Sequence, residues 1–115
     1  MKDFIKIFQA NKQYSEILRQ LRTGKDCTVN GLWGSSASFF IAALASEQLK
    51  TTKARPRILL VVPSIEEAEE DVEDLKTFLN GHVGLFPARE DIFTNNFENE
   101  GEVLAQRLHI LNQLL

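Results

Sequence analysis

The sequence predicts an α/β fold with three layers (αβα), in which helices cover both faces of a small parallel sheet. Three observations lead to this prediction. Strand-like segments alternate with segments of helical periodicity, which is the order that βαβ units produce. Residues 57–62 form a continuous aliphatic run, as expected for a parallel strand covered on both faces. A glycine-rich turn at residues 31–34 joins a strand-like segment to a long apolar helix, as a phosphate-binding loop does.

The first half of the chain is expected to contain helices before and after a short strand. Residues 4–8 form a short amphipathic turn or helix, and Gly24 lies where a glycine commonly caps a helix. Residues 27–32 are a plausible first strand, and residues 35–50 have the composition of a buried helix. Helical spacing connects four residues before Gly24: Tyr14, Ile17, Leu18 and Leu21.

The second half is expected to contain two strands and two helices. After the strand at residues 57–62, Ser64 and Glu67 have the spacing of a capping box at a helix start. A third, shorter strand covers residues 83–86, and a last helical pattern extends from Val103 to the final leucine. The helix after Ser64 has an apolar inner stripe: Ile65, Ala68, Val72, Leu75 and Leu79.

The expected organisation is an N-terminal helical segment at residues 1–24 and an α/β subdomain at residues 25–115. Three strands are few for a parallel sheet, and the last helical pattern has no cap. We therefore expect the sequence to be an incomplete fragment of a larger protein.

Composition is that of an ordinary globular protein, with 43% hydrophobic and 25% charged residues. The N-terminus mixes charges into its apolar residues, which is atypical of a secretory signal, and no apolar run is long enough for a membrane span. The single cysteine, Cys27, fits a reducing compartment, so we expect a cytoplasmic protein.

Two classes of binding are disfavoured. Cys27, His82 and His109 do not form a metal-binding pattern, so no metal is expected. A net charge of −3, from 13 basic and 16 acidic residues, does not favour a dedicated nucleic-acid binder.

The glycine-rich turn matches a phosphate-binding loop in position but not in chemistry. The pattern G-x-x-x-x-G-K-[ST] uses backbone N–H groups to surround phosphates, a lysine to neutralise them and a hydroxyl to ligate magnesium. Here Gly31 holds the first glycine position, while Ser36 and Ala37 replace the second glycine and the lysine. The hydroxyl position is kept, by Ser38. The candidate site comprises Gly31, Gly34, Ser35, Ser36, Ala37 and Ser38.

Neither catalysis nor a bound cofactor is expected at this loop. An oxyanion could still bind at the helix N-terminus, but a turn that only joins strand to helix is favoured, because the key charge is missing. Residues 61–64 end their strand without an acidic residue for a metal. Trp33 could mark a small-molecule pocket, and the favoured alternative is that it fills the space of an absent nucleotide.

The helix after Ser64 carries many acidic residues. They could dock a basic partner, but an ordinary solvated face is favoured, because acidic residues near a helix N-terminus interact well with the helix dipole. The acidic residues are Glu66, Glu67, Glu69, Glu70, Asp71, Glu73 and Asp74.

Four segments together resemble a known family. Residues 31–39 resemble the nucleotide loop of UvrB with its lysine erased, and residues 58–64, 85–93 and 102–108 follow in the order and spacing of that family. From about residue 28 onward, the chain is similar to the N-terminal UvrB-like module of the transcription-repair coupling factors, the Mfd family.

This resemblance implies a RecA-like P-loop fold, as in the first domain of UvrB, with a degenerate Walker A loop that has Ala37 in place of lysine. It implies a non-catalytic structural or interaction module. The parent would be an ATP-dependent DNA translocase that displaces stalled RNA polymerase and recruits UvrA for nucleotide excision repair. Implied partners are other domains of the parent, UvrA through the adjacent subdomain, and RNA polymerase and DNA through distant domains, with no membrane contact.

Two alternatives stay open. The chain could begin a UvrB-type or related DNA helicase, although that requires a lysine where Ala37 stands. It could also be a small stand-alone α/β binding module of receiver or flavodoxin type. A receiver needs clustered acidic residues at the end of its first strand, and only Asp26 lies nearby.

Overall fold

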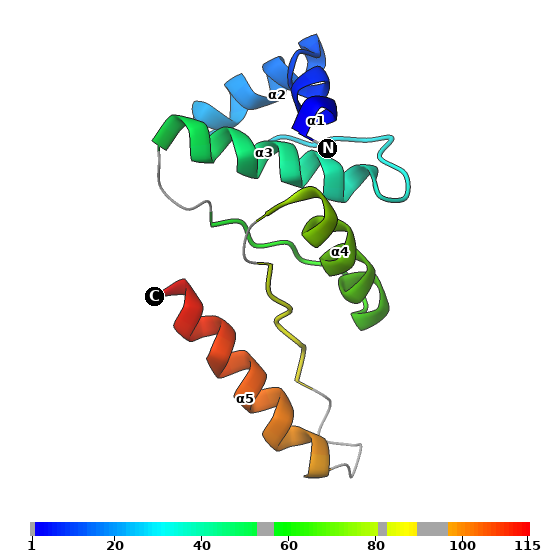
Figure 1. Ribbon diagram of the computed structural model, residues 1–115, viewed down its shortest axis with the longest axis vertical. Helices are drawn as coiled ribbons and strands as arrows, with labels where there is room; N and C mark the ends of the chain where they lie inside the picture. The colour runs from blue at the N-terminus through cyan, green and yellow to red at the C-terminus, as the bar shows by residue number, and fades with distance from the viewer. Residues whose placement is uncertain (1, 53–56, 81–82, 90–96) are drawn as a thin grey trace.

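The computed structural model describes residues 2–52, 57–80, 83–89 and 97–115. Within these residues the chain is all-helical, with five helices and no strand (Figure 1). The helices are α1 (Lys2–Gln9), α2 (Lys12–Arg22), α3 (Ser36–Thr52), α4 (Ile65–Phe78) and α5 (Phe97–Leu114).

The predicted three-layer αβα fold with a parallel sheet is therefore wrong. The segments expected as strands, at residues 27–32, 57–62 and 83–86, form no strand among the described residues. A strand needs a neighbour about 4.8 Å away to satisfy its backbone groups. In the third segment one backbone group is satisfied in another way: the Leu85 carbonyl accepts a hydrogen bond from the Gln106 side chain of α5 at 3.3 Å.

The hydrophobic core lies between the first three helices. Ile5 of α1, Tyr14 of α2 and two residues of α3, Phe40 and Ala43, are buried together. Val29, from the segment expected as the first strand, packs against this core from the side. Thr28, Asn30, Gly31 and Leu32 are exposed, so the segment contributes Val29 to the core and otherwise remains largely open to solvent.

Aromatic rings hold this core together. The Phe8 ring of α1 lies 5.2 Å from Tyr14, 5.4 Å from Phe39 and 6.1 Å from Phe40, between ring centres. Its contacts with Phe39 and Phe40 are edge-to-face, a geometry that adds to the energy of burial. Phe39 also meets Phe78 of α4 edge-to-face at 5.3 Å. The rings thus connect α1, α2, α3 and α4.

Local sequence explains where α2 begins and ends. The Asn11 side chain accepts hydrogen bonds from the N–H groups of Gln13 and Tyr14, as an N-cap does. At the other end Gly24 adopts φ +74°, and the Lys25 N–H donates to the Gln20 carbonyl at 3.1 Å. This is the Schellman arrangement, which confirms the predicted glycine cap.

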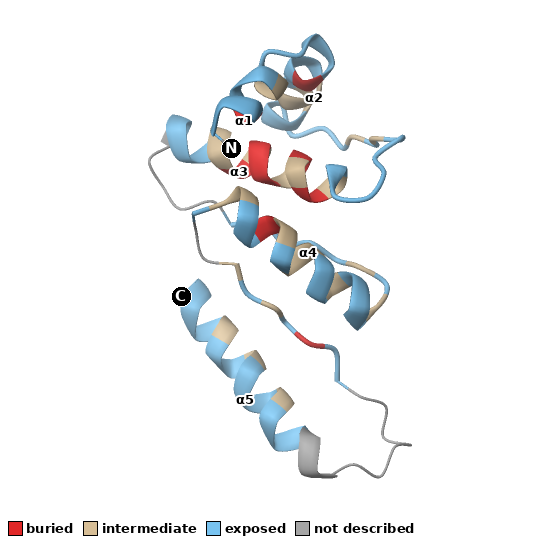
Figure 2. Ribbon diagram, turned by 45° about the vertical axis from the view of Figure 1, so that its right-hand side comes forward, coloured by how far each residue is buried: buried red, intermediate tan, exposed pale blue. Residues whose placement is uncertain are grey.

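Helix α3 is packed on two sides, by α1 and α2 on one and by α4 on the other (Figures 1 and 2). Its buried residues include Ala42, Ala43 and Ala45, whose small side chains let neighbouring helices approach closely. The predicted inner stripe of α4 is confirmed only in part: Leu75 is buried and Ala68, Val72 and Leu79 are half-buried, but Ile65 is 45% exposed. Ser64 caps α4 by accepting from the Glu67 N–H at 3.2 Å, as predicted.

Among the described residues, the contacts of helix α5 come mainly from residues 83–89. Arg107 donates to the Pro87 carbonyl at 2.6 Å, and its guanidinium lies 4.1 Å from the centre of the Phe86 ring. A Cβ added at Gly84 would lie 2.5 Å from Ile110, so glycine permits this close approach. The molecule is consequently elongated, with a radius of gyration of 16.3 Å against about 13 Å for a compact domain of this length.

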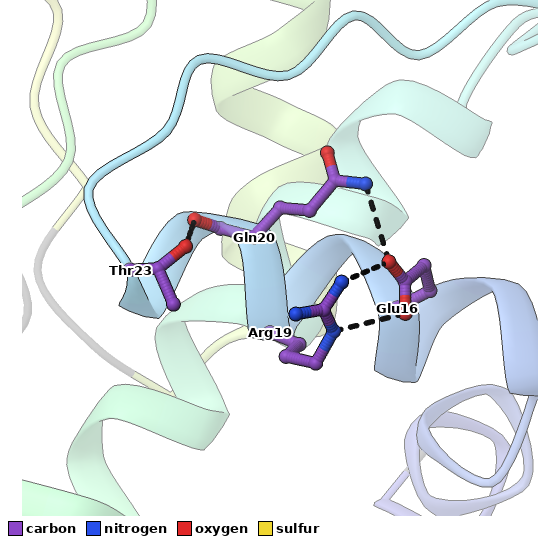
Figure 3. A network of polar contacts seen from close by, with 4 residues as sticks. All are labelled: Glu16, Arg19, Gln20 and Thr23. Carbon is purple, nitrogen blue, oxygen red and sulfur yellow. Dashed lines mark hydrogen bonds and ion pairs between the residues drawn. The ribbon is translucent and has the colours of Figure 1, made fainter.

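The surface of α2 carries an ion pair reinforced by an amide (Figure 3). Arg19 donates to both carboxylate oxygens of Glu16, at 2.6 and 3.1 Å, and Gln20 donates to the same group at 3.3 Å. The hydrogen bond from Arg19, followed by that from Gln20, lowers the pKa of Glu16 from 4.5 to about 2.

The Glu16–Arg19 pair should contribute to acid stability in one pH window. A carboxyl whose pKa is lowered by folding stabilises the folded state above pH 4.5, and that contribution disappears as the pH falls to about 2. Glu16→Gln should therefore lose less stability than the native chain across this window. Thermal unfolding at both ends of the window measures the difference, which should be small and should shrink in high salt, because the pair is exposed. Equal acid sensitivity of Glu16→Gln and the native chain would contradict the prediction.

Candidate functional site

The loop at residues 31–35 is shaped by two glycines in left-handed conformations. Gly31 has φ +81° and Gly34 has φ +53°, values that other residues adopt only with strain. No atom lies within 4 Å of a Cβ built at either position, so the backbone conformation explains these glycines and close packing does not. The Ser36 N–H donates to the Trp33 carbonyl at 3.1 Å, which closes the turn immediately before α3.

The structure separates the predicted site residues into two groups. Four of them, Gly31, Gly34, Ser35 and Ser36, are exposed on the loop and at the start of α3. Ala37 is half-buried and Ser38 is fully buried, on the side of α3 that faces α4. The loop residues therefore face solvent, whereas the Ser38 hydroxyl faces α4 in the protein interior.

Ser38 is engaged inside the protein. Its hydroxyl donates a hydrogen bond to the Asp71 carboxylate of α4 at 2.7 Å, and its exposed fraction is 0%. A bond to a charged acceptor is worth more than one between neutral groups, and a buried hydroxyl without a partner would be costly. The pair therefore fixes the beginning of α3 against the middle of α4.

The same pair changes the electrostatics at the α3 N-terminus. The first turn of a helix favours a negative charge, and phosphate-binding loops use this for phosphate. Here the first turn of α3 contains no acidic residue of its own, and Asp71 brings a carboxylate to Ser38 from α4. With no lysine at Ala37, a polyphosphate would meet one fixed negative charge and no compensating cation from this position.

Trp33 projects from the loop into solvent. Its exposed fraction is 84%, and that of the neighbouring Leu32 is 38%. The interpretation that Trp33 fills the space of an absent nucleotide is therefore wrong. The loop instead displays the chain's only tryptophan at its tip.

Sequence reasoning missed Asp71 as a partner of the loop helix, because it grouped this residue with the solvated acids of α4. A signal was present in the spacing. Asp71 lies three residues after Ala68 and four before Leu75, both members of the inner stripe, so it belongs to the inward side of the helix.

Other candidate sites are weaker. Among the described residues no group of three or more His, Cys, Asp or Glu side chains is arranged to hold a metal ion. Cys27 is half-buried and His109 lies exposed on α5, while His82 falls outside the described residues, as do residues 90–93 of the segment that carries part of the family resemblance. None of the helices in the described part of the chain is both long and apolar enough to cross a membrane.

Comparisons with known proteins give no relative for this chain: no protein-family model, no curated protein and no solved structure matches it.

The Ser38–Asp71 bond should show strong energetic coupling. Ser38→Ala leaves the Asp71 carboxylate without its buried donor, and Asp71→Ala leaves the hydroxyl without its acceptor, so each should cost about 1–3 kcal/mol. Urea unfolding of both single variants and the double variant gives the coupling energy, expected at about 1.5–3 kcal/mol, because one partner is charged.

Ser46→Ala on the same helix is the matched control, because no described residue forms a hydrogen bond with the Ser46 hydroxyl. It should change stability by less than about 0.5 kcal/mol. Strict additivity of the Ser38 and Asp71 substitutions would show that the bond contributes nothing in solution.

Proposed function

We propose that this chain is a non-catalytic interaction module that serves as the N-terminal module of a transcription-repair coupling factor. The assignment as non-catalytic rests on one observation, the burial and hydrogen bonding of Ser38. The residue at the magnesium-ligating position is buried and bound to Asp71, next to an alanine at the lysine position. Support for the family comes from the sequence resemblance of residues 31–39 and the three segments that follow them.

Within such a parent, the exposed loop would act as a docking element. Tryptophan is enriched among the residues that contribute most to protein interfaces, because a large rigid ring is buried at little entropic cost. Trp33 lies at the tip of a turn that has Gly31 before it and Gly34 after it, so its ring is accessible to a partner. The partners we propose are other domains of the parent and UvrA at the adjacent subdomain, with RNA polymerase and DNA contacted by distant domains.

The docking role can be tested through Trp33 itself, because it is the only tryptophan in the chain. Mixing the chain with UvrA, or with a coupling factor that lacks its own N-terminal module, should shift the Trp33 fluorescence to shorter wavelength as the ring leaves water. Trp33→Ala should weaken binding, measured by calorimetry, by at least about tenfold, which corresponds to about 1.4 kcal/mol.

Leu32→Ala is the matched control from the same loop and should have a smaller effect, because Leu32 exposes a smaller fraction of its surface. Failure of both candidate partners to bind or to change the fluorescence would reject the coupling-factor assignment. Binding that is unaffected by Trp33→Ala would reject the loop as the docking element.

The loop should not bind ATP, and restoring its motif should not create an enzyme. Calorimetry with ATP and magnesium should show no micromolar binding by the native chain. Ser36→Gly combined with Ala37→Lys restores the G-x-x-x-x-G-K-[ST] pattern and should give weak phosphate binding at most, because Asp71 still lies beside Ser38. Adding Asp71→Asn should strengthen that binding by removing the negative charge.

Phosphate release by these variants should equal that of buffer. Turnover also needs a carboxylate placed to hold magnesium and orient water, and usually an arginine from a facing domain. Multiple-turnover ATPase activity in the double variant would mean that the rest of a catalytic site is intact, and would contradict the non-catalytic assignment.

A further inference from the structure

Residues 58–62 form an extended apolar segment that lies open on the surface. In Figure 1 it is the green stretch that runs below α3 before α4 begins. Its exposure alternates with a period of two: Leu59 and Val61 are 83% and 81% exposed, whereas Ile58 and Leu60 are about half as exposed, at 40% and 39%. This alternation is that of a strand with one face toward the protein and one toward solvent.

The backbone of this segment is also unpaired. Between described residues, no backbone–backbone hydrogen bond involves residues 58–62. A row of free N–H and C=O groups on an apolar extended segment is a template for pairing with another strand. The five residues are aliphatic and contain no charge, which strengthens this tendency.

We propose that residues 58–62 pair with the same residues of a second copy of this chain, as a two-stranded antiparallel ribbon. The residues at the two ends of the segment 58–62 determine which residues of the two copies lie opposite each other. Arg57 bounds the segment on one side and Pro63, which has no N–H to donate, on the other. Full overlap of the five residues places Leu60 opposite Leu60, and Leu59 opposite Val61 on the solvent face.

Charge favours the antiparallel direction and is complementary between two copies of this chain. In this register Arg57 lies opposite Pro63 of the other copy, close to the first turn of its α4, where Glu66 and Glu67 are exposed. Two-fold symmetry forms this arrangement twice. Parallel pairing would instead place Arg57 beside Arg57 and one acidic turn beside the other, so like charges would oppose it.

The pairing is weak and reversible. A two-stranded ribbon is marginally stable in water, and the α4 carboxylates are solvated. We therefore expect a reversible monomer–dimer equilibrium and not a permanent dimer. The surface does not include the loop at residues 31–35, so this inference does not depend on the proposed function.

Disulfide trapping tests the register directly. In a Cys27→Ser background, Leu60→Cys places one thiol opposite its own copy, at a Cα separation of about 4.5–5.5 Å for directly opposed residues. That separation is within the range of about 4.4–6.8 Å that a disulfide allows. Mild oxidation should give a covalent dimer rapidly. Leu59→Cys should react more slowly, because its own counterpart is a diagonal neighbour about 7–8 Å away.

A cysteine on a helix controls for non-specific association between copies. Leu108 on α5 is 57% exposed, so Leu108→Cys has an accessible thiol outside the strand. Cross-linking of Leu108→Cys or Leu59→Cys at the same rate as Leu60→Cys would overturn the proposed register. Fastest cross-linking at Leu108 would mean that copies meet through α5.

Sedimentation equilibrium over a concentration series tests the pairing without cysteines. The native chain should show a reversible monomer–dimer equilibrium. Leu59→Lys with Val61→Lys should leave only monomer, whereas Leu104→Lys with Leu108→Lys on α5 should leave the equilibrium unchanged. All four positions are exposed, and circular dichroism checks that helix content is retained.

A charge exchange tests the direction of the strands. Arg57→Glu should weaken the dimer several-fold, and combining it with Glu66→Arg should restore the native affinity. A native chain that stays monomeric at every concentration, or a dimer that is insensitive to Leu59→Lys with Val61→Lys, would overturn the proposal.

Discussion

The burial of α3 between two sets of helices is the constraint on which the rest of the structure depends. One side of this helix packs against α1 and α2 through Phe40 and Ala43, and the other meets α4 through Ser38. A helix covered on both sides cannot carry bulky residues all round without pushing its neighbours apart. The buried alanines at positions 42, 43 and 45 meet part of this requirement, while Phe40 is buried and Ile41 and Leu44 lie half-buried among them.

That constraint also determines what the loop before α3 can do. Because Ser38 lies on the buried side of the helix, its hydroxyl must find a partner within the protein, and Asp71 provides it. The residues one turn earlier remain in solvent and are free to present Trp33. Ser38, whose position in a nucleotide-binding loop would bind magnesium, therefore joins α3 to α4. The exposed part of the loop remains available for contact with other molecules.

The sequence was informative where structure follows from local chemistry. The glycine cap at Gly24 and the serine cap at Ser64 depend only on neighbouring residues, and both are confirmed. The inner stripe of α4 is confirmed at Leu75, whereas Ile65, at its start, is exposed. The strands were predicted wrongly because a strand exists only where its backbone pairs with that of a neighbouring strand, which the sequence of one segment does not specify. An aliphatic run such as residues 57–62 has the same pattern whether it lies in a sheet or alone on a surface. Asp71 was missed for a related reason, since its role appears only when α3 and α4 are brought together.

The attachment of α5 has a consequence for how the molecule opens. The contacts that hold this helix come largely from residues 84–87, through Ile110, Arg107 and Gln106, whereas α1 to α4 share interlocked aromatic rings. Separate units of a protein open with free energies set by their own contacts. Amide hydrogens of α5 therefore exchange through local detachment, without waiting for the ring cluster to come apart. A protease that needs unfolded backbone reaches α5 first and leaves the first four helices as the resistant remainder.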